Sequence, residues 1–341
     1  MKKSDIVKEY LSLYPKMKGF TLAKKIFAEN EGVFDTSEQT RKLINYYRGL
    51  NGDRDRKRLA NRKHQVPLTY DTTNTKMEKI QTSAKVLILD IETAPISAYV
   101  WGIWNQNVHL PQIKTDWFCL TWAAKWLFED KVYSAKLKPD EVLKQDDKRI
   151  MEGIWKLVNE ADIVIAHNAE KFDIPRLNSR FILNGLNPPL PYQVIDTLRH
   201  IRRQFGFTSN KLDYVNKLLN LERKKETSFE LWDNCMKGDK KALKEMEEYN
   251  VQDVRILEET YLQIRSWIKP HPNMGLFILD ETEHRCPSCG SNELEAQGKC
   301  YNTSVNIYEL FRCKNCNSIS RKRLAATTIK QKRHLLIPTA K

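Results

Sequence analysis

The stretch VLILDIETAP, residues 86–95, constrains the fold of this chain more than any other. The apolar run from Val86 to Leu89 predicts a short strand that is buried on both faces. Asp90 and Glu92 follow one residue apart, and the alternation of side chains along a strand points both carboxylates the same way. Two such acids repel each other unless a cation lies between them. An isolated pair is more typical of a solvated strand end, with Glu92 capping a helix. The other acids of the chain therefore decide whether this pair belongs to a metal site.

A second acid lies in AHNAEKFDIPRL, residues 166–177. The residues DIVIAHN predict another buried strand that ends in His167 and Asn168, and Asp173 comes five residues after Asn168. Strands of an open α/β sheet end along one edge, so Asp173 can reach the neighbourhood of the first two acids. Taken alone, Asp173 would be the N-cap of the helix that follows, with Pro175 in its first turn, and this role is compatible with metal binding.

A further acid lies in MEEYNVQDVRILEETYLQI, where Tyr249 and Asp253 are four residues apart. On a helix this spacing places both side chains on one face, one turn apart. A tyrosine beside a helix-borne aspartate can hold a water molecule that a metal on the aspartate activates. The YxxxD pattern is common in helices, so its meaning depends on the acids that precede it.

The segments around these motifs predict an α/β fold with a mixed sheet flanked by helices. Aromatic and β-branched residues predict strands in ISAYVWGIW, NQNVHL, FCLTWAAKWL and KVYSAKL, beside the first strand. DDKRIMEGIWKLVNEA has the pattern of an amphipathic helix and DIVIAHN follows it, which completes the strand, helix, strand unit of α/β folds. We expect a helix in DIPRLNSRFILNG, a strand into QVIDTL, and an almost wholly helical stretch to about Ile268.

The order DxE, then HNxxxFD, then YxxxD resembles the DEDD superfamily of 3′-to-5′ exonucleases, the DnaQ-like proofreading group with the ribonuclease-H-like fold. Tyr249 stands where another subclass carries histidine, so the chain resembles the tyrosine subclass. It looks especially like predicted stand-alone exonucleases related to the proofreading domain of family B polymerases. The resemblance covers roughly Lys85 to Ile268, includes VIDTL and NKLDYVNKLL, and leaves no motif position empty.

This resemblance implies hydrolysis of phosphodiester bonds with two Mg²⁺ or Mn²⁺ ions. Asp90 would bridge both ions, while Glu92 and Asp253 would complete the site of the attacking water. Asp173 would support the second ion near the leaving oxygen, and Tyr249 would orient the nucleophile. Carboxylate oxygens suit these cations, and two ions about 4 Å apart stabilise both oxygens of an in-line displacement.

His167 and Asn168 are candidates for bracing the site or contacting the substrate, and a purely structural role at the strand end is equally open for His167. Exposed aromatic rings can stack on the bases of a single-stranded 3′ end. Most large aromatic residues in such strands belong to the core, so we expect at most one or two tryptophans to act as platforms. The candidates are Trp101, Trp104, Trp117, Trp122 and Trp126.

The C-terminal segment carries the strongest local pattern in the chain. RCPSCG and RCKNCN place Cys286, Cys289, Cys313 and Cys316 in two CxxC pairs separated by 23 residues. Four thiolates make a closed tetrahedral zinc site, which is structural because no position stays open for water. The residues between the pairs alternate like β-strands, so the segment resembles a zinc ribbon that needs its metal to fold. Cys300 is left over and is not an expected ligand.

Residues 4–50 show three helical patterns, SDIVKEYLSLYP, TLAKKIFAEN and TSEQTRKLINYYRG. Thr36 or Ser37 can cap the third, which ends at Gly49. These helices suggest a helix-turn-helix and resemble the small module of several phage-type nucleases, whose third helix is taken to enter a DNA groove. A bundle for packing or for binding a protein is the alternative. The apolar face of the third helix is Leu43, Ile44 and Tyr47, which leaves Gln39, Arg41, Lys42 and Arg48 for a partner.

The composition favours a polyanionic partner, since 57 Lys and Arg against 43 Asp and Glu give a net charge of +14. Basic residues gather in NGDRDRKRLANRKHQ and after the ribbon, where a phosphate backbone, a solvated charge run or a protein-docking role can each explain them. The sequence shows no run of about 18 apolar residues and no secretory signal. We therefore expect a soluble cytoplasmic protein, in the host cytoplasm if phage-encoded, with no membrane partner. Its seven cysteines are not a disulfide framework, and Cys119 and Cys235 are expected in the core.

We expect a metal-dependent 3′-to-5′ exonuclease acting on DNA, above all on single-stranded 3′ ends, with any replication or repair partner acting in trans. An RNA exonuclease and a structure-specific endonuclease stay open, because one carboxylate set serves all three. A DNA-binding regulator that has lost activity is disfavoured by the presence of every motif residue. The expected parts are a helix-turn-helix at 1–50, a basic and polar linker at 51–84, the exonuclease domain at 85–269, a linker at 270–281, the zinc ribbon at 282–325 and a basic tail at 326–341.

Overall fold

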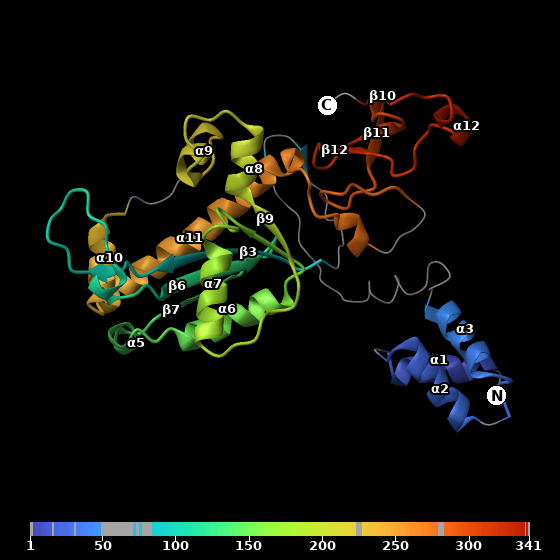
Figure 1. Ribbon diagram of the computed structural model, residues 1–341, viewed down its shortest axis with the longest axis horizontal. Coiled ribbons are helices and arrows are strands. Elements are labelled where there is room, and N and C mark those ends of the chain that lie inside the picture. The colour runs from blue at the N-terminus through green and yellow to red at the C-terminus, as the bar shows by residue number, and fades with distance from the viewer. Residues whose placement is uncertain are drawn as a thin grey trace.

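The computed structural model describes residues 3–15, 17–30, 32–48, 71–72, 75–76, 84–222, 227–278, 283–337 and 339. These residues form an N-terminal group of helices, a central α/β domain and a C-terminal group of strands (Figure 1). Most of the expected linker at 51–84 lies outside the described residues. Within it, the short strands β1 (Asp71–Thr72) and β2 (Thr75–Lys76) pair with each other.

The central sheet has the strand order β7-β6-β3-β8-β9. β3 (Val86–Thr93) lies in the middle, as its buried apolar run requires. On one side it pairs antiparallel with β6 (Cys119–Trp126), which pairs antiparallel with β7 (Val132–Lys136). On the other side it pairs parallel with β8 (Ile163–Ala166), which pairs parallel with β9 (Gln193–Asp196). The predicted mixed sheet is confirmed.

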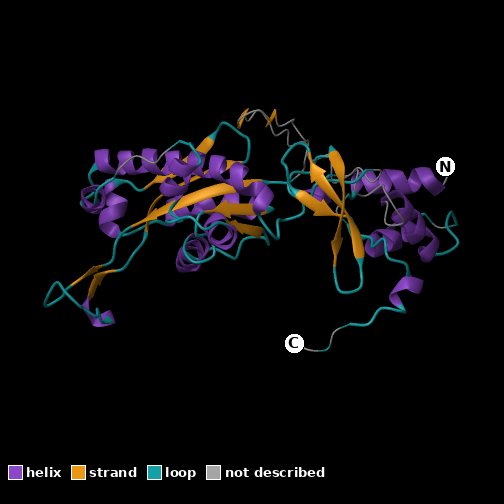
Figure 2. Ribbon diagram, turned by 90° about the horizontal axis from the view of Figure 1, so that it is seen from above, coloured by secondary structure: helices purple, strands orange, loops and turns teal. Residues whose placement is uncertain are grey.

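Helices cover both faces of this sheet (Figures 1 and 2). Leu87 and Leu89 of β3 share one apolar cluster with α6 and α7, whereas Ile88 belongs to a second cluster with α8, α9 and the C-terminal half of α11. Because successive strand residues point to opposite faces, Asp90 and Glu92 share the face of Ile88, which α11 covers. The helices are α5 (Pro139–Lys144), α6 (Lys148–Glu160), α7 (Asp173–Leu183), α8 (Thr197–Gln204), α9 (Leu212–Leu218), α10 (Phe229–Met236) and α11 (Lys240–Ile264).

The strands predicted at 96–104 and 105–110 do not join the central sheet, so that part of the prediction is wrong. The region instead forms an arm in which β4 (Ser97–Ala98) pairs with β5 (Ile113–Thr115), preceded by a 3-10 turn at Leu110–Gln112. The arm is the cyan loop beside α10 in Figure 1. Its aromatic composition imitates a strand, but Trp101 is 99% exposed and the segment has no core to pack against.

The N-terminal helices are α1 (Lys3–Leu13), α2 (Gly19–Glu29) and α3 (Ser37–Arg48), which pack around one apolar cluster. Thr36 caps α3 as predicted, because its Oγ1 accepts the backbone N–H of Gln39 at 3.1 Å. Gln39 is not free for a partner, since its Oε1 accepts from Lys3 Nζ at 3.2 Å and from the Asp35 backbone at 3.1 Å. Gly49, the predicted helix end, lies outside the described residues.

The C-terminal strands β10 (Leu294–Asn302), β11 (Ile307–Cys313) and β12 (Ile319–Arg321) form an antiparallel sheet, and a short helix α12 (Ile329–Lys332) follows. A 3-10 turn at Met274–Phe277 leads from the central domain toward this sheet, and the Met274 N–H donates to the Pro287 carbonyl at 2.7 Å. Across the described ranges, every helix is too short or too polar to cross a bilayer.

Candidate active site

Three carboxylates meet at the end of β3 beneath α11. Asp90 and Glu92 come from the strand and Asp253 from the helix, and one ligand oxygen from each lies within 4.8 Å of the others. Asp253 is only 1% exposed, whereas Asp90 and Glu92 are half-buried. Residues more than 160 positions apart in the chain thus face one another, and oxygens at this spacing can hold a hard divalent cation.

Asn250 supports this cluster from the same helix. It is fully buried and its Nδ2 donates to Asp90 Oδ2 at 2.6 Å. This bond fixes one oxygen of Asp90. The sequence reasoning missed Asn250, although its place between Tyr249 and Asp253 on a helix face turned toward the sheet was a usable signal.

Asp173 opens α7 and is 1% exposed. Within the described part of the chain neither of its carboxylate oxygens accepts a hydrogen bond, so the alternative reading of Asp173 as the N-cap is wrong. Burial raises the pKa of this carboxyl well above its ordinary value, and the charge of Asp90 raises it further. Asp173 lies outside the 4.8 Å cluster, but the charges of Asp90 and Glu92 in that cluster raise its pKa. Two buried oxygens in this state need a proton or a cation, and they therefore fit a metal ligand.

Tyr249 lies one turn before Asp253, as the YxxxD spacing predicts. It is 8% exposed, and its ring meets Trp232 edge-on with centroids 6.4 Å apart. This contact packs the phenol ring of Tyr249 against α10.

His167 braces the strand end. Its Nδ1 lies 2.9 Å from Thr197 Oγ1 and its Nε2 lies 3.1 Å from the Asn210 carbonyl, so both ring nitrogens have protein partners. Asn168 differs, because its backbone adopts φ +80°, a conformation that Asn tolerates better than most residues, and it lines a pocket. Of the two, Asn168 is the better placed to contact a substrate.

Asp196 is a second residue that the sequence reasoning missed. It ends β9 within VIDTL and accepts three backbone N–H groups, from Asn168 at 3.0 Å and from Glu170 and Arg199 at 3.1 Å. Its charge also contributes to the raised pKa of Asp173. An acid between a parallel strand and a helix is a typical N-cap, and that pattern was visible in the sequence.

The tryptophans divide as the sequence led us to expect. Trp122 is in the core and its indole N–H donates to the Ile150 carbonyl at 2.6 Å. Trp126 is half-buried, and Trp117 lies 4.4 Å from the guanidinium of Arg176. Only Trp101 and Trp104, at 99% and 83% exposure, present open faces among these five.

The four cysteines of the CxxC pairs form a second cluster, far from the acids in sequence. Their sulfur atoms lie within 4.8 Å of one another, with separations of 3.5 Å between Cys286 and Cys316 and 3.6 Å between Cys289 and Cys313. A zinc ion with Zn–S bonds of about 2.3 Å sets sulfur atoms about 3.8 Å apart, so the donors fit zinc. Cys300 is exposed and outside this cluster.

The end of α11 ties the cysteine cluster to the central domain. Arg265 follows the helix and is 3% exposed. Burial lowers the pKa of its guanidinium, but the charges of Tyr261 and of the knuckle thiols outweigh that effect and keep it raised. A buried cation therefore stands beside the four cysteines. Cys119 and Cys235 are buried in the core of the central domain, as predicted.

Comparison with protein-family models agrees with this fold. Residues 127–264 match the family model of the RNase H superfamily. None of the curated proteins matches the chain. Among solved structures, the chain is similar to the family B DNA polymerase from the hyperthermophilic archaeon Pyrobaculum calidifontis, at 17% identity and a TM-score of 0.39. That alignment covers 56% of this chain and 26% of the polymerase chain.

The central domain therefore has a ribonuclease-H-like fold, as the motif order suggested. The family match and the cluster of acids at the end of its middle strand support a nuclease that uses divalent metal ions.

Proposed function

We propose that this chain is a metal-dependent 3′-to-5′ exonuclease of the tyrosine subclass that removes nucleotides from DNA, above all from single-stranded 3′ ends. One observation carries the proposal: Asp90, Glu92 and Asp253, which are far apart in the sequence, converge within 4.8 Å. Asp173, buried and with no hydrogen-bond partner among the described residues, adds a fourth carboxylate beside them.

Each side chain has a task in this reaction. Asp90, on the middle strand, would help to hold both cations, while Glu92 and Asp253 would hold one and Asp173 would hold the other. Two Mg²⁺ or Mn²⁺ ions would supply an activated water and would neutralise charge on the phosphodiester.

Asn250 and Tyr249 act beside the carboxylates. Asn250 keeps Asp90 in one orientation through the 2.6 Å hydrogen bond. Tyr249 orients the attacking water from α11, one turn before Asp253. Asn168 contacts the substrate from the turn after β8, and His167 holds that turn in place through its two ring nitrogens.

The flanking parts would grip the nucleic acid. In the N-terminal helices, which we interpret as a helix-turn-helix, Arg41 and Lys42 of α3 are exposed as expected for a DNA-facing helix. In the C-terminal part, which we interpret as a zinc ribbon with one structural zinc ion, Arg321 lies over the Tyr308 ring at 4.0 Å. We place the reaction in the cytoplasm, or the host cytoplasm if a phage encodes the chain, with any replication or repair partner in trans.

The test uses 5′-end-labelled single- and double-stranded DNA and RNA, with and without Mg²⁺ or Mn²⁺. A ladder of labelled products that shorten from the 3′ end, formed only with metal, is the expected result. Internal cuts would replace the proposal by an endonuclease, degradation restricted to RNA would replace it by an RNA exonuclease, and binding without cleavage would make the protein a regulator.

Two variants link this activity to the site. Asp90→Ala and Asp253→Ala should abolish degradation while DNA binding stays largely intact. Asp140→Ala, which removes an exposed carboxylate from α5, is the matched control and should cut normally. Unchanged cleavage by either site variant would refute the assignment.

A further inference from the structure

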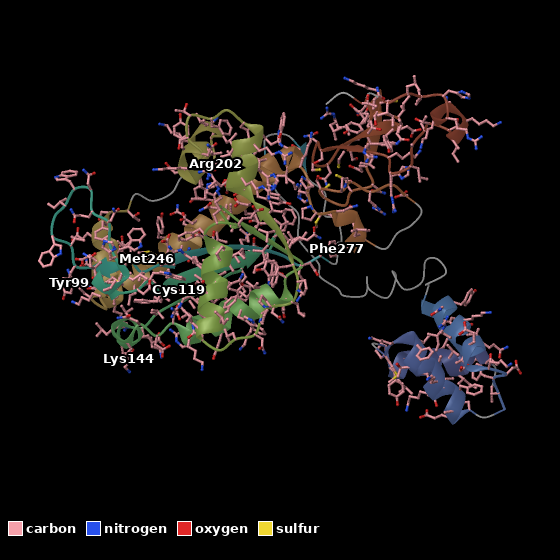
Figure 3. The ribbon with its side chains drawn as sticks, viewed as in Figure 1. Tyr99, Cys119, Lys144, Arg202, Met246 and Phe277 are labelled. Atoms are coloured by element: carbon pink, nitrogen blue, oxygen red, sulfur yellow. The ribbon has the colours of Figure 1, made fainter. Side chains whose placement is uncertain are left out.

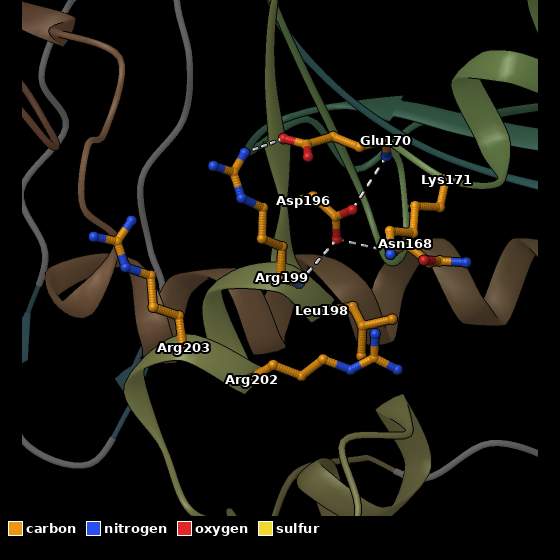
Figure 4. A pocket seen from close by; sticks show the side chains of 8 residues that line it. All are labelled: Asn168, Glu170, Lys171, Asp196, Leu198, Arg199, Arg202 and Arg203. Atoms are coloured by element: carbon orange, nitrogen blue, oxygen red, sulfur yellow. Dashed lines mark hydrogen bonds and ion pairs between the residues drawn. The ribbon is translucent and has the colours of Figure 1, made fainter.

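A pocket of about 300 Å³ opens between the turn that follows β8, which leads to Asp173, and the helix α8 (Figure 4). We propose that it binds backbone phosphates of a single-stranded nucleic acid, outside the bond that is cut. This inference rests on the proposed function, because it assigns the path of the strand whose 3′ end is in the site. Two features place the pocket there: Asn168 of the HNxxxFD motif lines it, and Asp196 in its wall accepts the backbone N–H groups of Asn168 and Glu170, in the turn that leads to Asp173.

The positive charge of this pocket exceeds its negative charge. Four cationic side chains line it, together with two acids, Glu170 and Asp196. Both acids are already engaged, since Asp196 accepts three backbone N–H groups and Glu170 forms an ion pair with Arg199. The remaining cations are therefore available to an anion from solvent.

Those remaining cations are Lys171, Arg202 and Arg203. Among the described residues, the side chains of Lys171 and Arg202 have neither a hydrogen bond nor an ion pair, and both residues are exposed. Arg203 makes one long contact, from its guanidinium to the Lys269 carbonyl at 3.5 Å. Unpaired guanidinium groups in a polar hollow are suited to phosphate, which they can bind through two parallel hydrogen bonds.

Helix α8 supplies the three arginines of the pocket. Arg199, Arg202 and Arg203 are three and four residues apart, a spacing that places them on one side of the helix. Figure 4 shows the Arg202 side chain running along Leu198 toward the side of the pocket where Asn168 and Lys171 lie. The turn is held rigid, because the N–H groups of Asn168 and Glu170 both bond to Asp196. A strand that enters past Asn168 would thus meet a preformed cationic wall.

This pocket is tested by measuring how a 5′-fluorescein dT20 strand binds to the full chain. The chain carries Asp90→Ala, which stops cleavage of the strand. The dissociation constant is measured by anisotropy from 50 to 300 mM NaCl, against the same protein carrying Arg202→Ala and Arg203→Ala. Each phosphate contact on a single strand contributes about 0.7 to the slope of log K against log salt. We expect the Arg202→Ala, Arg203→Ala double variant to make that slope less steep by roughly 1.4. Its binding should be roughly tenfold weaker at low salt.

Two controls separate this effect from general charge and from folding. Lys144→Ala removes an exposed cation at the opposite end of the central domain from Arg202, as Figure 3 shows, and should keep the wild-type slope. Arg202→Lys with Arg203→Lys keeps the charge and should keep most of the slope. A double alanine variant with the slope of Lys144→Ala would overturn the proposal, as would a loss of slope in the lysine variant equal to that in the alanine variant.

The source of the phosphate is settled by titration with dTMP and with inorganic phosphate. Neither should bind in the range that dT20 does, because the pocket is proposed to act on several phosphates of one strand. Tight binding of dTMP that the double alanine variant loses would make this a mononucleotide site and overturn the proposal. Failure of this proposal and failure of the proposed function give different results. If the wild type degrades DNA with metal but the double alanine variant keeps the slope, only the pocket proposal fails. If the double alanine variant loses the slope but the wild type degrades nothing, only the exonuclease proposal fails.

Discussion

The substitution Asp253→Asn should stabilise the metal-free protein. Carboxylates whose oxygens lie within 4.8 Å repel by about 3.5 kcal/mol per pair at an effective dielectric constant of about 20. Asp253 takes part in two of the three pairs of the cluster, so its charge accounts for about 7 kcal/mol of gross repulsion. Solvent around the half-buried Asp90 and Glu92 reduces the net gain to roughly 1–2 kcal/mol.

Divalent metal should reverse the order of stability. An ion that binds only the folded state adds about 2.7 kcal/mol when its concentration is 100 times the dissociation constant. Wild type should gain this in Mn²⁺, whereas Asp253→Asn should gain little because it has lost a ligand. For a domain of this size, the variant should melt roughly 3–6 °C above wild type in EDTA and below it in Mn²⁺.

Differential scanning calorimetry of both proteins at pH 8, with EDTA and with 10 mM Mn²⁺, measures this. Asp140→Asn, which changes an exposed acid of α5, is the control and should leave both melting temperatures where they are. A variant that melts below wild type in EDTA would show that the acids do not repel as their spacing requires. An equal gain from Mn²⁺ in both proteins would show that the ion binds elsewhere.

Other predictions address the supports of the site. Asp147 is fully buried and accepts two hydrogen bonds from the Arg180 guanidinium, at 2.6 and 2.8 Å. Asp147→Ala should lower the free energy of unfolding in urea by about 3–5 kcal/mol, because it leaves that guanidinium unpaired. A loss below about 1 kcal/mol would contradict this. Burial lowers the pKa of His271 to about 4 from its ordinary 6.5, so the folded protein should lose about 3 kcal/mol or less as the pH falls from about 6.5 to 4. His271→Gln should flatten that part of the curve of stability against pH, and an equally steep fall would refute the reasoning. Cys286→Ser should release the zinc measured by metal analysis and unfold only the C-terminal module, and unchanged zinc content would reject the zinc ribbon.

The sequence predicts the central fold well where one physical signal dominates. The run from Val86 to Leu89 is apolar at every position, which only a strand buried on both faces explains, and it lies in the middle of the sheet. The same holds for the helix at Lys148–Glu160, whose apolar residues recur with helical spacing. The four cysteines are a third case, because their spacing is itself a metal-binding geometry.

Prediction fails where composition is ambiguous. The arm from β4 to β5 is rich in aromatic and β-branched residues, and only the folded chain shows that Trp101 and Trp104 have no surface to cover. Asn250 and Asp196 were missed for another reason. A local pattern marked each position, the sheet-facing side of a helix for Asn250 and an N-cap for Asp196. Their partners, Asp90 for the first and the turn at Asn168 for the second, lie more than 25 residues away, and no local pattern identifies such partners.

The most direct test is an anomalous-scattering map of Mn²⁺ in crystals of the wild-type protein soaked with dTMP. Two peaks roughly 4 Å apart, one bounded by Asp90, Glu92 and Asp253 and the other by Asp90 and Asp173, are the predicted result. A map in which Mn²⁺ contacts none of these carboxylates, or in which Asp173 faces away from every ion, would contradict it.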